Sequence, residues 1–326
     1  MKANKNILIL YIMNINIPKE PTTLIKHGTK LHDDYQWMKT NKQKAVKVIN
    51  KLNKSTNKLF RANKSLQTKL SDEFKNRIVE NYETIPTRKE IFKYQYIIRK
   101  GENYGKYYCI DGCNKKILFD CEKESIGHEY WDMTGPLISK SEEIIVYSID
   151  FVGNDENKLY FKKFYDNNNT EIKNPKKLRI SNDFFLANDS NTLYYVTMNN
   201  SGRNNKVWMV KLNDLKTHKC IYTENNDLYN VSISSTFNSF KILIYVTSSD
   251  YTEVLLIDHD EKIKKLFSRT QKALISIDYK GGVWYILFEK DNKTRMIYST
   301  DKYIKTHKTW LPYKKNEIYE YFVLKG

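Results

Sequence analysis

A hairpin that recurs about every 45 residues is the feature that most restricts what this chain can fold into. In each copy a charged residue opens a short apolar strand, and a turn and another apolar strand come before it. The five copies of this strand open at Lys106, Lys158, Lys206, Glu253 and Arg295. Their turns carry Gly, Asn, Asp and Ser, which are the residues that hairpin turns favour. Antiparallel hairpins at this period are typical of β-propeller blades, so the sequence predicts five blades.

A sixth unit begins with "IYEYFVL" at Ile318, close to the last residue of the sequence. The predicted fold class is therefore mainly β, an incomplete β-propeller preceded by a helical segment. A β-sandwich with a helical lead is the alternative, and it predicts strands at irregular spacing. The regular placement of the hairpins favours the propeller.

The first 80 residues follow a helical period instead. Apolar residues recur at helical spacing from about residue 33 to residue 78, with Lys, Asn and Gln between them. They are Ala45, Ile49, Leu52, Leu59, Phe60, Leu66, Leu70, Phe74 and Ile78. We expect two or three amphipathic helices whose apolar stripes must be buried against something. The predicted organisation is an N-terminal strand or tail over residues 1–19, a helical segment over 20–79 and a partial propeller over 80–326.

The formal charge of +17 would ordinarily suggest a nucleic acid or an anionic membrane as partner. Only eight of the 55 basic residues are Arg, which is the residue that reads bases and clamps phosphates. Lys, Asn, Ile and Tyr share A/T-rich codons, so a nucleotide bias in the genome would give this composition without any function. We therefore expect no nucleic acid as partner.

A membrane partner and an oxidising compartment are also not expected. The apolar run from Ile7 to Met13 is too short to span a bilayer and has no small-residue cleavage site after it. The four cysteines form no C-x-x-C. Cys109, Cys113 and Cys121 fall in or near strand-like runs, where buried free thiols are the rule. This usage suits a reducing compartment and predicts a cytoplasmic protein.

Motifs that carry chemistry do not occur in the sequence. It has no G-x-S-x-G, G-x-x-x-x-G-K-[ST], G-x-G-x-x-G or H-E-x-x-H. The nearest match is "GENYG" from Gly101 to Gly105, which has Asn103 where a nucleophile elbow needs serine and which lies at a predicted hairpin tip. We therefore predict no catalytic, cofactor-binding or metal-binding residue in this chain, and no cofactor.

Scattered aspartates and histidines do not change that prediction. Asp155, Asp258 and Asp260 fall in predicted turns, where Asx turns explain them better than a bound cation. The histidines lie far apart along the chain, at His27, His32, His128, His218, His259 and His307.

The stretch "HGTKLHDDYQWMK", which begins at His27, admits two interpretations. Asp33 and Asp34 could form a carboxylate pair, with His27 and His32 as metal ligands. Adjacent aspartates point in different directions, however, and two histidines five apart match no compact metal spacing. The structural interpretation is a helix entry with Asp33 or Asp34 as N-cap, followed by apolar anchors. These anchors are Tyr35, Trp37 and Met38.

The same stretch resembles the N-terminal signature of the prolyl oligopeptidase family of serine peptidases, in which a His-Gly turn leads to Asp-Asn/Asp-Tyr-x-Trp-Leu. It is most similar to the oligopeptidase B branch, also called protease II. "SLQTKLSDEFKNRI" resembles the helix after the signature, and "FFLANDSNTLYYV" resembles a propeller segment of that branch. "VWMVKL", "IYTENNDLYNVSISST" and "TEVLLID" follow in the expected order. The resemblance runs from about residue 18 to the last residue, and it departs from the pattern at Met38, Lys30 and Leu31.

The resemblance implies a seven-bladed propeller inserted near the start of an α/β-hydrolase domain. The family's catalytic Ser, Asp and His lie after the propeller, so none of them is placed on this chain. In relatives, the segment that resembles residues 20–75 packs on the hydrolase domain. We therefore expect about five of seven blades here, no hydrolase domain, and a structural role for Asp33 and Asp34.

Two functions from different classes follow. The first is the N-terminal propeller part of an oligopeptidase B-like serine peptidase, which in the family gates short peptides and cleaves after basic residues. The catalytic half is then encoded as a separate chain, which would be the partner, or the gene is a decayed remnant. The second is a stand-alone propeller that binds a partner protein without hydrolase activity. The apolar stripes and the end in mid-repeat favour the first. We expect the chain alone to be inactive, with open strand edges on its first and last units.

Overall fold

The computed structural model describes residues 17–166, 168–237, 241–258, 261–315 and 319. It divides into two compact units, Met1–Glu80 and Asn81–Gly326. The strand or tail expected over residues 1–19 lies outside the described residues except for its last three. The strand expected at Ile318 also lies outside them, apart from Tyr319.

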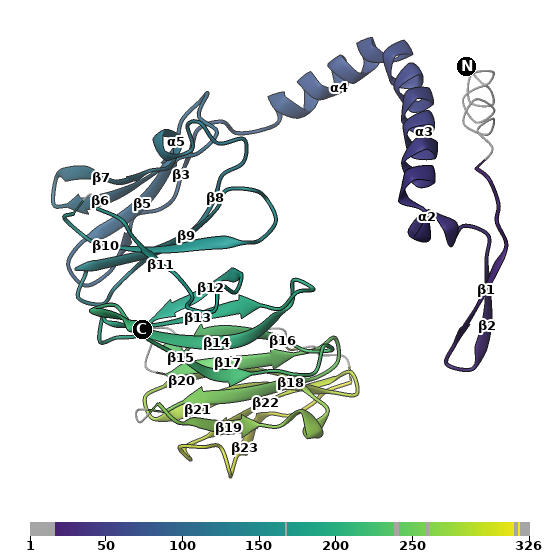
Figure 1. Cartoon of the computed structure of the whole chain (residues 1–326). Helices are drawn as coiled ribbons and strands as arrows, with labels where there is room; N and C mark the ends of the chain where they lie inside the picture. The colour runs from purple at the N-terminus through teal and green to yellow at the C-terminus, as the bar shows by residue number, and fades with distance from the viewer. Residues whose placement is uncertain (1–16, 167, 238–240, 259–260, 316–318, 320–326) are drawn as a thin grey trace. The chain divides into compact units, whose positions relative to one another are not determined.

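The first unit opens with a β-hairpin (Figure 1). Strand β1 (Thr22–Lys26) pairs antiparallel with β2 (Thr29–Asp33) across a turn at His27 and Gly28. These two residues have φ of 49° and 78°, and positive φ at both central positions gives the turn whose twist matches a hairpin. A helical segment from residue 20 onward was predicted, and the hairpin corrects its first part because the His-Gly pair turns the chain back on itself.

Three helices follow the hairpin, as the apolar periodicity predicts: α2 (Trp37–Thr40), α3 (Lys42–Ala62) and α4 (Lys64–Asn76). Helix α3 begins where the Asn41 side chain accepts the Lys44 N–H at 3.1 Å. Trp37 is buried, its indole N–H donates to the Pro18 carbonyl at 2.9 Å, and the Lys44 ammonium lies 4.7 Å from its ring centre. Trp37, in α2, therefore connects the segment around Pro18 with helix α3.

The N-cap prediction for this stretch is wrong. The Asp33 carboxylate accepts the Tyr35 N–H at 2.8 Å, whereas the N-cap of α2 is Gln36. Asp33 closes an Asx turn because it lies too far before the helix to reach the N–H groups of its first turn. Asp34 pairs instead with Lys19 at 3.2 Å. Of the three predicted anchors Trp37 is buried, Met38 is half-buried and Tyr35 is exposed.

The second unit contains, within the described residues, four antiparallel sheets, one of which has eight strands because a single pairing of β10 with β12 joins two four-stranded units. We call the five resulting units blades 1 to 5 (Figure 1). Blade 1 comprises β3 (Tyr82–Glu83) and β4 (Thr87–Arg88), which share one position, then β5 (Lys93–Ile98), β6 (Lys106–Asp111) and β7 (Asn114–Asp120). Blade 2 comprises β8 (Asp132–Ile138), β9 (Ile144–Asp150), β10 (Asn157–Lys163) and β11 (Thr170–Ile172). Blade 3 comprises β12 (Ile180–Leu186), β13 (Thr192–Met198), β14 (Asn204–Lys211) and β15 (Asp214–Thr223).

Blade 4 comprises β16 (Asn230–Ser235), β17 (Ile242–Thr247), β18 (Thr252–Ile257) and β19 (Ile263–Phe267). Blade 5 comprises β20 (Leu274–Lys280), β21 (Val283–Lys290), β22 (Lys293–Ser299) and β23 (Lys308–Leu311). Two short helices, α5 (Cys121–Glu124) and the 3-10 helix η2 (Arg269–Gln271), lie between blades. The five predicted hairpins form the two middle strands of the five blades, and their second strands occupy the equivalent third position in each. The propeller prediction is confirmed.

The core lies between blades rather than within them. Each of four buried apolar clusters joins two consecutive blades, from the blade 1 and 2 pair to the blade 4 and 5 pair. Neighbouring residues of β13 show the principle, because Tyr194 and Val196 face blade 4 whereas Leu193 and Tyr195 face blade 2. All seven residues of β13 are buried as a result.

Among the described blades, blades 1 and 5 have only one face covered by another blade, whereas blades 2 to 4 have both faces covered. Along β21 of blade 5, Trp284, Ile286 and Phe288 are buried against blade 4, and the residues between them are half-buried. Open strand edges were expected on the first and last units, and that expectation stays a prediction. Because the described blades pack face to face, blades 1 and 5 also present a sheet face to any further neighbour.

Buried or half-buried carboxylates accept backbone N–H groups across the blade junctions. Glu142, in the β8–β9 turn of blade 2, accepts the N–H groups of Glu90, Ile91 and Phe92 of blade 1 at 2.7–3.1 Å, and the Tyr94 hydroxyl at 2.7 Å. Asp183 of β12 accepts the N–H of Ile233 in β16 at 3.0 Å. Asp278 of β20 accepts the N–H of Phe237 at 2.6 Å. These bonds fix the register of one blade on the next.

We predict that Asp183 makes stability depend on pH in an unusual direction. Burial raises its pKa to about 6 against the ordinary 3.8, and the bond from Ile233 only partly offsets this. Between these two pH values the Asp183 carboxyl is ionised in the unfolded chain and protonated in the folded chain. Its contribution to the free energy of unfolding is therefore lost as pH rises from about 4 to 6. Asp183→Asn keeps an acceptor for Ile233 without the charge. The free energy of unfolding of Asp183→Asn, compared with that of the wild type, should therefore be about 1–3 kcal/mol more favourable at pH 7.5 than at pH 4.

The measurement is urea unfolding of wild type and Asp183→Asn at both pH values. Asp214→Asn is the control, because Asp214 is an exposed residue of the same blade. A difference between wild type and Asp183→Asn that stays constant with pH would contradict the prediction.

Candidate functional site

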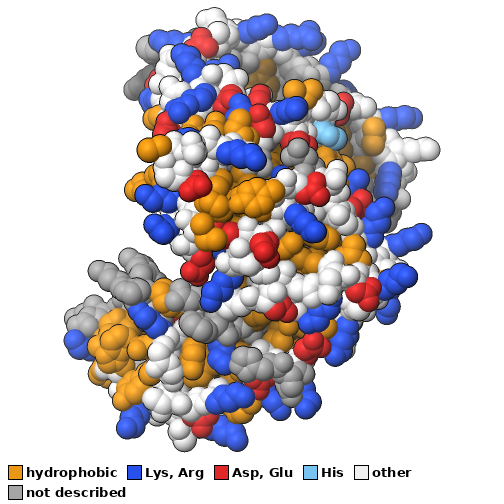
Figure 2. Space-filling model, turned by 90° about the vertical axis from the view of Figure 1, so that its left-hand side faces the viewer, with side chains coloured by type: hydrophobic (Ala, Val, Ile, Leu, Met, Phe, Trp, Pro, Cys, Tyr) orange, Lys and Arg blue, Asp and Glu red, His pale blue; other side chains and the backbone are white. Residues whose placement is uncertain are grey.

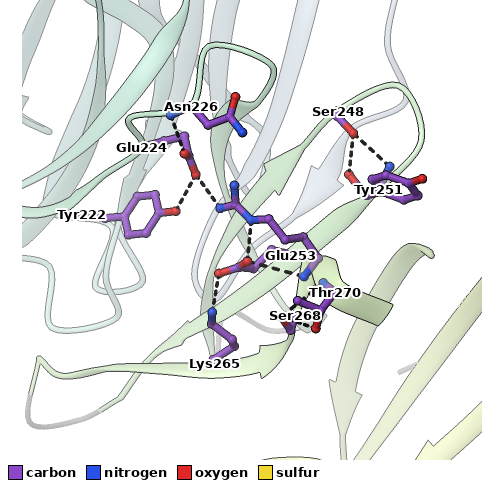
Figure 3. A network of polar contacts seen from close by, with 10 residues as sticks. Tyr222, Glu224, Asn226, Ser248, Tyr251, Glu253, Lys265, Ser268 and Thr270 are labelled. Atoms are coloured by element: carbon purple, nitrogen blue, oxygen red, sulfur yellow. Dashed lines mark hydrogen bonds and ion pairs between the residues drawn. The ribbon is translucent and has the colours of Figure 1, made fainter. Parts of the chain in front are cut away.

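Arg269 is the centre of a charged network in the propeller, and Figure 3 shows its partners Glu224 and Glu253. It lies in η2, after blade 4, and its guanidinium donates to Glu224 at 2.5 Å and to Glu253 at 2.8 Å. Glu224 follows β15 of blade 3, and Glu253 lies in β18 of blade 4. The guanidinium carbon is 4.1 Å from the ring centre of Tyr229. One arginine therefore bridges two blades.

The two carboxylates are fully engaged. Glu224 also accepts the Tyr222 hydroxyl at 3.0 Å and the Asn226 N–H at 2.8 Å, and Glu253 pairs with Lys265 at 3.0 Å. Burial raises the pKa of both carboxyl groups, but the donated hydrogen bonds outweigh burial, so the pKa of each lies below its usual range. The bond to Glu224 is the main reason why the pKa of Arg269 is raised. The charged groups of this cluster find their hydrogen-bond partners within the protein, which is typical of a cluster that holds two blades together.

No catalytic constellation is assembled from the described histidines. His32 contacts the Thr23 hydroxyl at 3.0 Å, His218 contacts the Tyr195 hydroxyl at 2.7 Å, and His128 packs on the ring of Phe151. His259 lies outside the described residues. The glycines of "GENYG" have a structural reason, since a Cβ at Gly105 would lie 2.4 Å from the Ile97 carbonyl oxygen.

The turn aspartates have structural partners. In the loop with Asp155 it is Asp150 whose carboxylate accepts the N–H groups of Val152, Gly153 and Asp155, at 2.8–2.9 Å. Asp155 was expected to close this turn, so that assignment is corrected. Asp258 accepts the Tyr303 hydroxyl at 2.7 Å and Lys302 at 3.1 Å, and Asp260 lies outside the described residues. The ranges that the structure describes hold no group of three or more metal-ligating side chains.

All four cysteines are free thiols. Cys109 and Cys121 are buried, as expected for cysteines in strand-like runs. Cys113 is exposed because it lies in the β6–β7 turn, directly after Gly112 with φ of 55°. No helix among the described residues is long and apolar enough to cross a membrane.

Two apolar surfaces stand out as candidate binding surfaces. The first, which we call the helical stripe, lies on α3 and α4, and its side chains are 41–60% exposed. It comprises Val46, Ile49, Phe60, Leu66, Leu70 and Phe74. The second, which we call the blade 5 face, lies opposite the face that blade 4 covers. It comprises Leu274, Tyr285, Leu287, Tyr298 and Trp310.

Hydrophobic side chains also gather in patches on the face of the molecule drawn in Figure 2, between lysines and arginines that are scattered over it. The helical stripe was predicted from the sequence, whereas the blade 5 face and the Arg269 network were not. The sequence did contain a sign of the network. Arginine is scarce in this lysine-rich chain, and Arg269 lies between two predicted hairpins.

The fold is that of a β-propeller domain, and comparison with known proteins gives its family. A family profile described as the prolyl oligopeptidase N-terminal β-propeller domain matches residues 16–324. The chain belongs to the prolyl oligopeptidase family, of which it provides this propeller domain.

Its relatives include the branch that the sequence motifs predict. "Protease 2" of Moraxella lacunata is 19% identical over 252 residues, which is 74% of this chain and 36% of that protein. Oligopeptidase B of Leishmania major superposes with a TM-score of 0.74 at 17% identity, covering 91% of this chain and 46% of that one. Oligopeptidase B of Trypanosoma brucei gives 0.75 at 16% identity, covering 92% and 46%. The chain thus spans less than half the length of these relatives.

We predict that Arg269→Ala will destabilise the propeller by about 3–5 kcal/mol at neutral pH, because it leaves two buried carboxylates without their shared cation. Both carboxyls have a lowered pKa in the folded chain, so their contribution is present above pH 4.5 and is lost as pH falls through the folded pKa. The deficit of the variant should therefore shrink in acid.

Thermal melting at pH 7 and pH 4 measures this deficit. Arg203→Ala is the matched control, since the Arg203 side chain has no ion pair among the described residues. Equal melting temperatures of Arg269→Ala and the control would refute the prediction.

Proposed function

We propose that this chain is the substrate-gating propeller of an oligopeptidase B-like serine peptidase whose catalytic Ser, Asp and His lie outside these 326 residues. The hydrolase domain belongs either to the remainder of the same polypeptide or to a separate chain. The propeller would admit short peptides, and the peptidase would cleave them after basic residues. The family match and the coverage of less than half of each relative support this proposal. The free state of all four cysteines supports a cytoplasmic location.

One observation carries the proposal most directly: the chain has two apolar surfaces that its described residues leave half open. Six large side chains of the helical stripe are 41–60% exposed. Completing their burial would contribute on the order of 5–10 kcal/mol, since full burial of such a side chain contributes about 1.5–3 kcal/mol. That is comparable to the net stability of a whole domain. A self-sufficient module would not leave this much apolar surface in water.

The blade 5 face supports the same conclusion independently. Blades 2 to 4 are covered on both faces, and the covered faces carry large apolar residues at every second position. In blade 5, strands β21 and β22 repeat this alternation on the face that no described blade covers, where Tyr285 pairs with Tyr298 and Leu287 with Met296. A further blade is the partner that fits such a face.

We predict that the purified chain will not hydrolyse arginyl or lysyl peptide substrates. The sequence has no G-x-S-x-G elbow, and no described histidine is hydrogen-bonded to a serine–aspartate pair. A fluorogenic peptide assay tests this, with and without a covalent serine-hydrolase inhibitor. Turnover by the isolated chain that the inhibitor abolishes would overturn the proposal that catalysis resides elsewhere.

We also predict that the isolated chain associates or is marginally folded, and that it becomes monodisperse when co-expressed with a chain carrying the remaining blades and the hydrolase domain. Phe74→Asp with Leu70→Asp should block that rescue, because both residues lie on the helical stripe. Lys75→Asp is the control on the same helix. Size-exclusion chromatography and thermal melting give the readout.

Two results would go against this prediction. A monodisperse monomer that melts cooperatively on its own would favour the stand-alone binding module. Rescue that survives Phe74→Asp with Leu70→Asp would show that the helical stripe is not the docking surface.

A further inference from the structure

A cavity of about 220 Å³ lies at the junction of blades 1 and 2, and none of its lining residues belongs to either apolar surface described above. It is lined from blade 1 by Phe92, Cys109 and Leu118, and from blade 2 by Lys162 and Phe164. A shallower hollow that shares Phe164 and Tyr165 adjoins it. Its volume is large enough for a small aromatic molecule.

The aromatic walls of the cavity are held in place by the blade junction. The rings of Phe92 and Phe164 stack with centres 5.6 Å apart and planes 13° from parallel. The N–H of Phe92 donates to Glu142 at 3.1 Å, and the N–H of Phe164 donates to the Glu143 carbonyl at 2.7 Å. Both rings are therefore fixed to the same turn of blade 2, and the wall that they form is preorganised.

Lys162 places an ammonium group with few hydrogen-bond acceptors beside these apolar walls. Its half-buried ammonium donates to the Leu118 carbonyl at 3.2 Å and lies 5.0 Å from the ring centre of Phe119. Within the described part of the chain no carboxylate forms an ion pair with it, and an ammonium has three N–H donors. Burial lowers the pKa of Lys162 and the charge of Lys116 acts in the same sense, while Glu124 and Asp166 act in the opposite sense. An anion entering the cavity would supply the missing acceptor.

We propose that the cavity between blades 1 and 2 binds a small aromatic carboxylate, with its ring against Phe92 and Phe164 and its carboxylate on the ammonium of Lys162. The ring gains from apolar burial and stacking. The charge gains because a carboxylate on a partly buried ammonium forms a charge-assisted hydrogen bond. Lys116 also lines the cavity and adds positive charge.

Two acids line the cavity as well, and they do not replace the ligand. Asp111 is exposed, and the Asp166 carboxylate accepts the Asn168 N–H at 2.9 Å. Neither forms an ion pair with Lys162. Their presence disfavours a dianion and is compatible with a single carboxylate.

The test is isothermal titration of the full chain with phenylacetate at millimolar concentration, and with phenylacetamide as its uncharged analogue. Lys162→Met removes the charge and keeps the length of the side chain, and because it relieves the burial of a charge it should fold at least as well as the wild type. Lys158→Met is the matched control: Lys158 lies on the same strand, β10, and the same face, but it is exposed and contacts Phe151 instead.

We expect saturable binding of phenylacetate to the wild type and to Lys158→Met. Lys162→Met should weaken it at least tenfold, which corresponds to about 1.4 kcal/mol. Phenylacetamide should bind as weakly to the wild type as phenylacetate binds to Lys162→Met. Three results would each overturn the proposal. They are no saturable binding of phenylacetate to the wild type, equal affinity of the wild type and Lys162→Met for phenylacetate, and equal affinity of the wild type for phenylacetate and phenylacetamide. None of these outcomes depends on whether the chain gates a peptidase.

Discussion

Face-to-face packing of apolar β-sheets is the constraint on which the rest of this structure depends. Each blade has too few residues to enclose a core of its own, so its large side chains become buried only when a neighbouring blade covers them. β13 is buried along its whole length because Leu193 and Tyr195 pack on blade 2 while Tyr194 and Val196 pack on blade 4. Within the described residues, blades 1 and 5 each pack on one neighbouring blade, whereas blades 2 to 4 each pack on two.

Polar groups decide how the blades align once apolar packing has brought them together. Glu142, Asp183 and Asp278 each accept backbone N–H groups of a neighbouring blade, and Arg269 joins Glu224 to Glu253 across the junction of blades 3 and 4. Apolar contacts are non-directional, so they tolerate a slide of one sheet over the next. A buried or half-buried carboxylate does not tolerate such a slide, because the slide would leave it without donors. A few acidic residues at the junctions thus fix how neighbouring blades align. The chain has 55 basic and 38 acidic residues, and its basic excess lies mainly on the surface.

Much of this arrangement could be predicted from sequence pattern. The spacing of the strands at Lys106, Lys158, Lys206, Glu253 and Arg295 predicts five equivalent hairpins, and all five are found. The stripe from Ile49 to Phe74 predicts helices with one apolar side. Local turn chemistry was harder to predict. Asp33 was expected as an N-cap and closes a turn before the helix, and the hairpin at His27 and Gly28 was not expected, because single residues specify a turn only together with the conformation of their neighbours.

The sequence by itself determined the period of the fold, the change from helix to strand near residue 80, and the lack of a nucleophile elbow, because these depend on residues close together in the chain. Tertiary structure alone decided which faces become buried and which charges meet. Glu142 and Phe92 are 50 residues apart, and Arg269 and Glu224 are 45 apart, so no local pattern links them. Phe92, Lys162 and Phe164 likewise surround one cavity only because two blades stack. Hairpin periodicity follows from bonding between neighbours, whereas a site between blades exists only once two separate sheets have packed together.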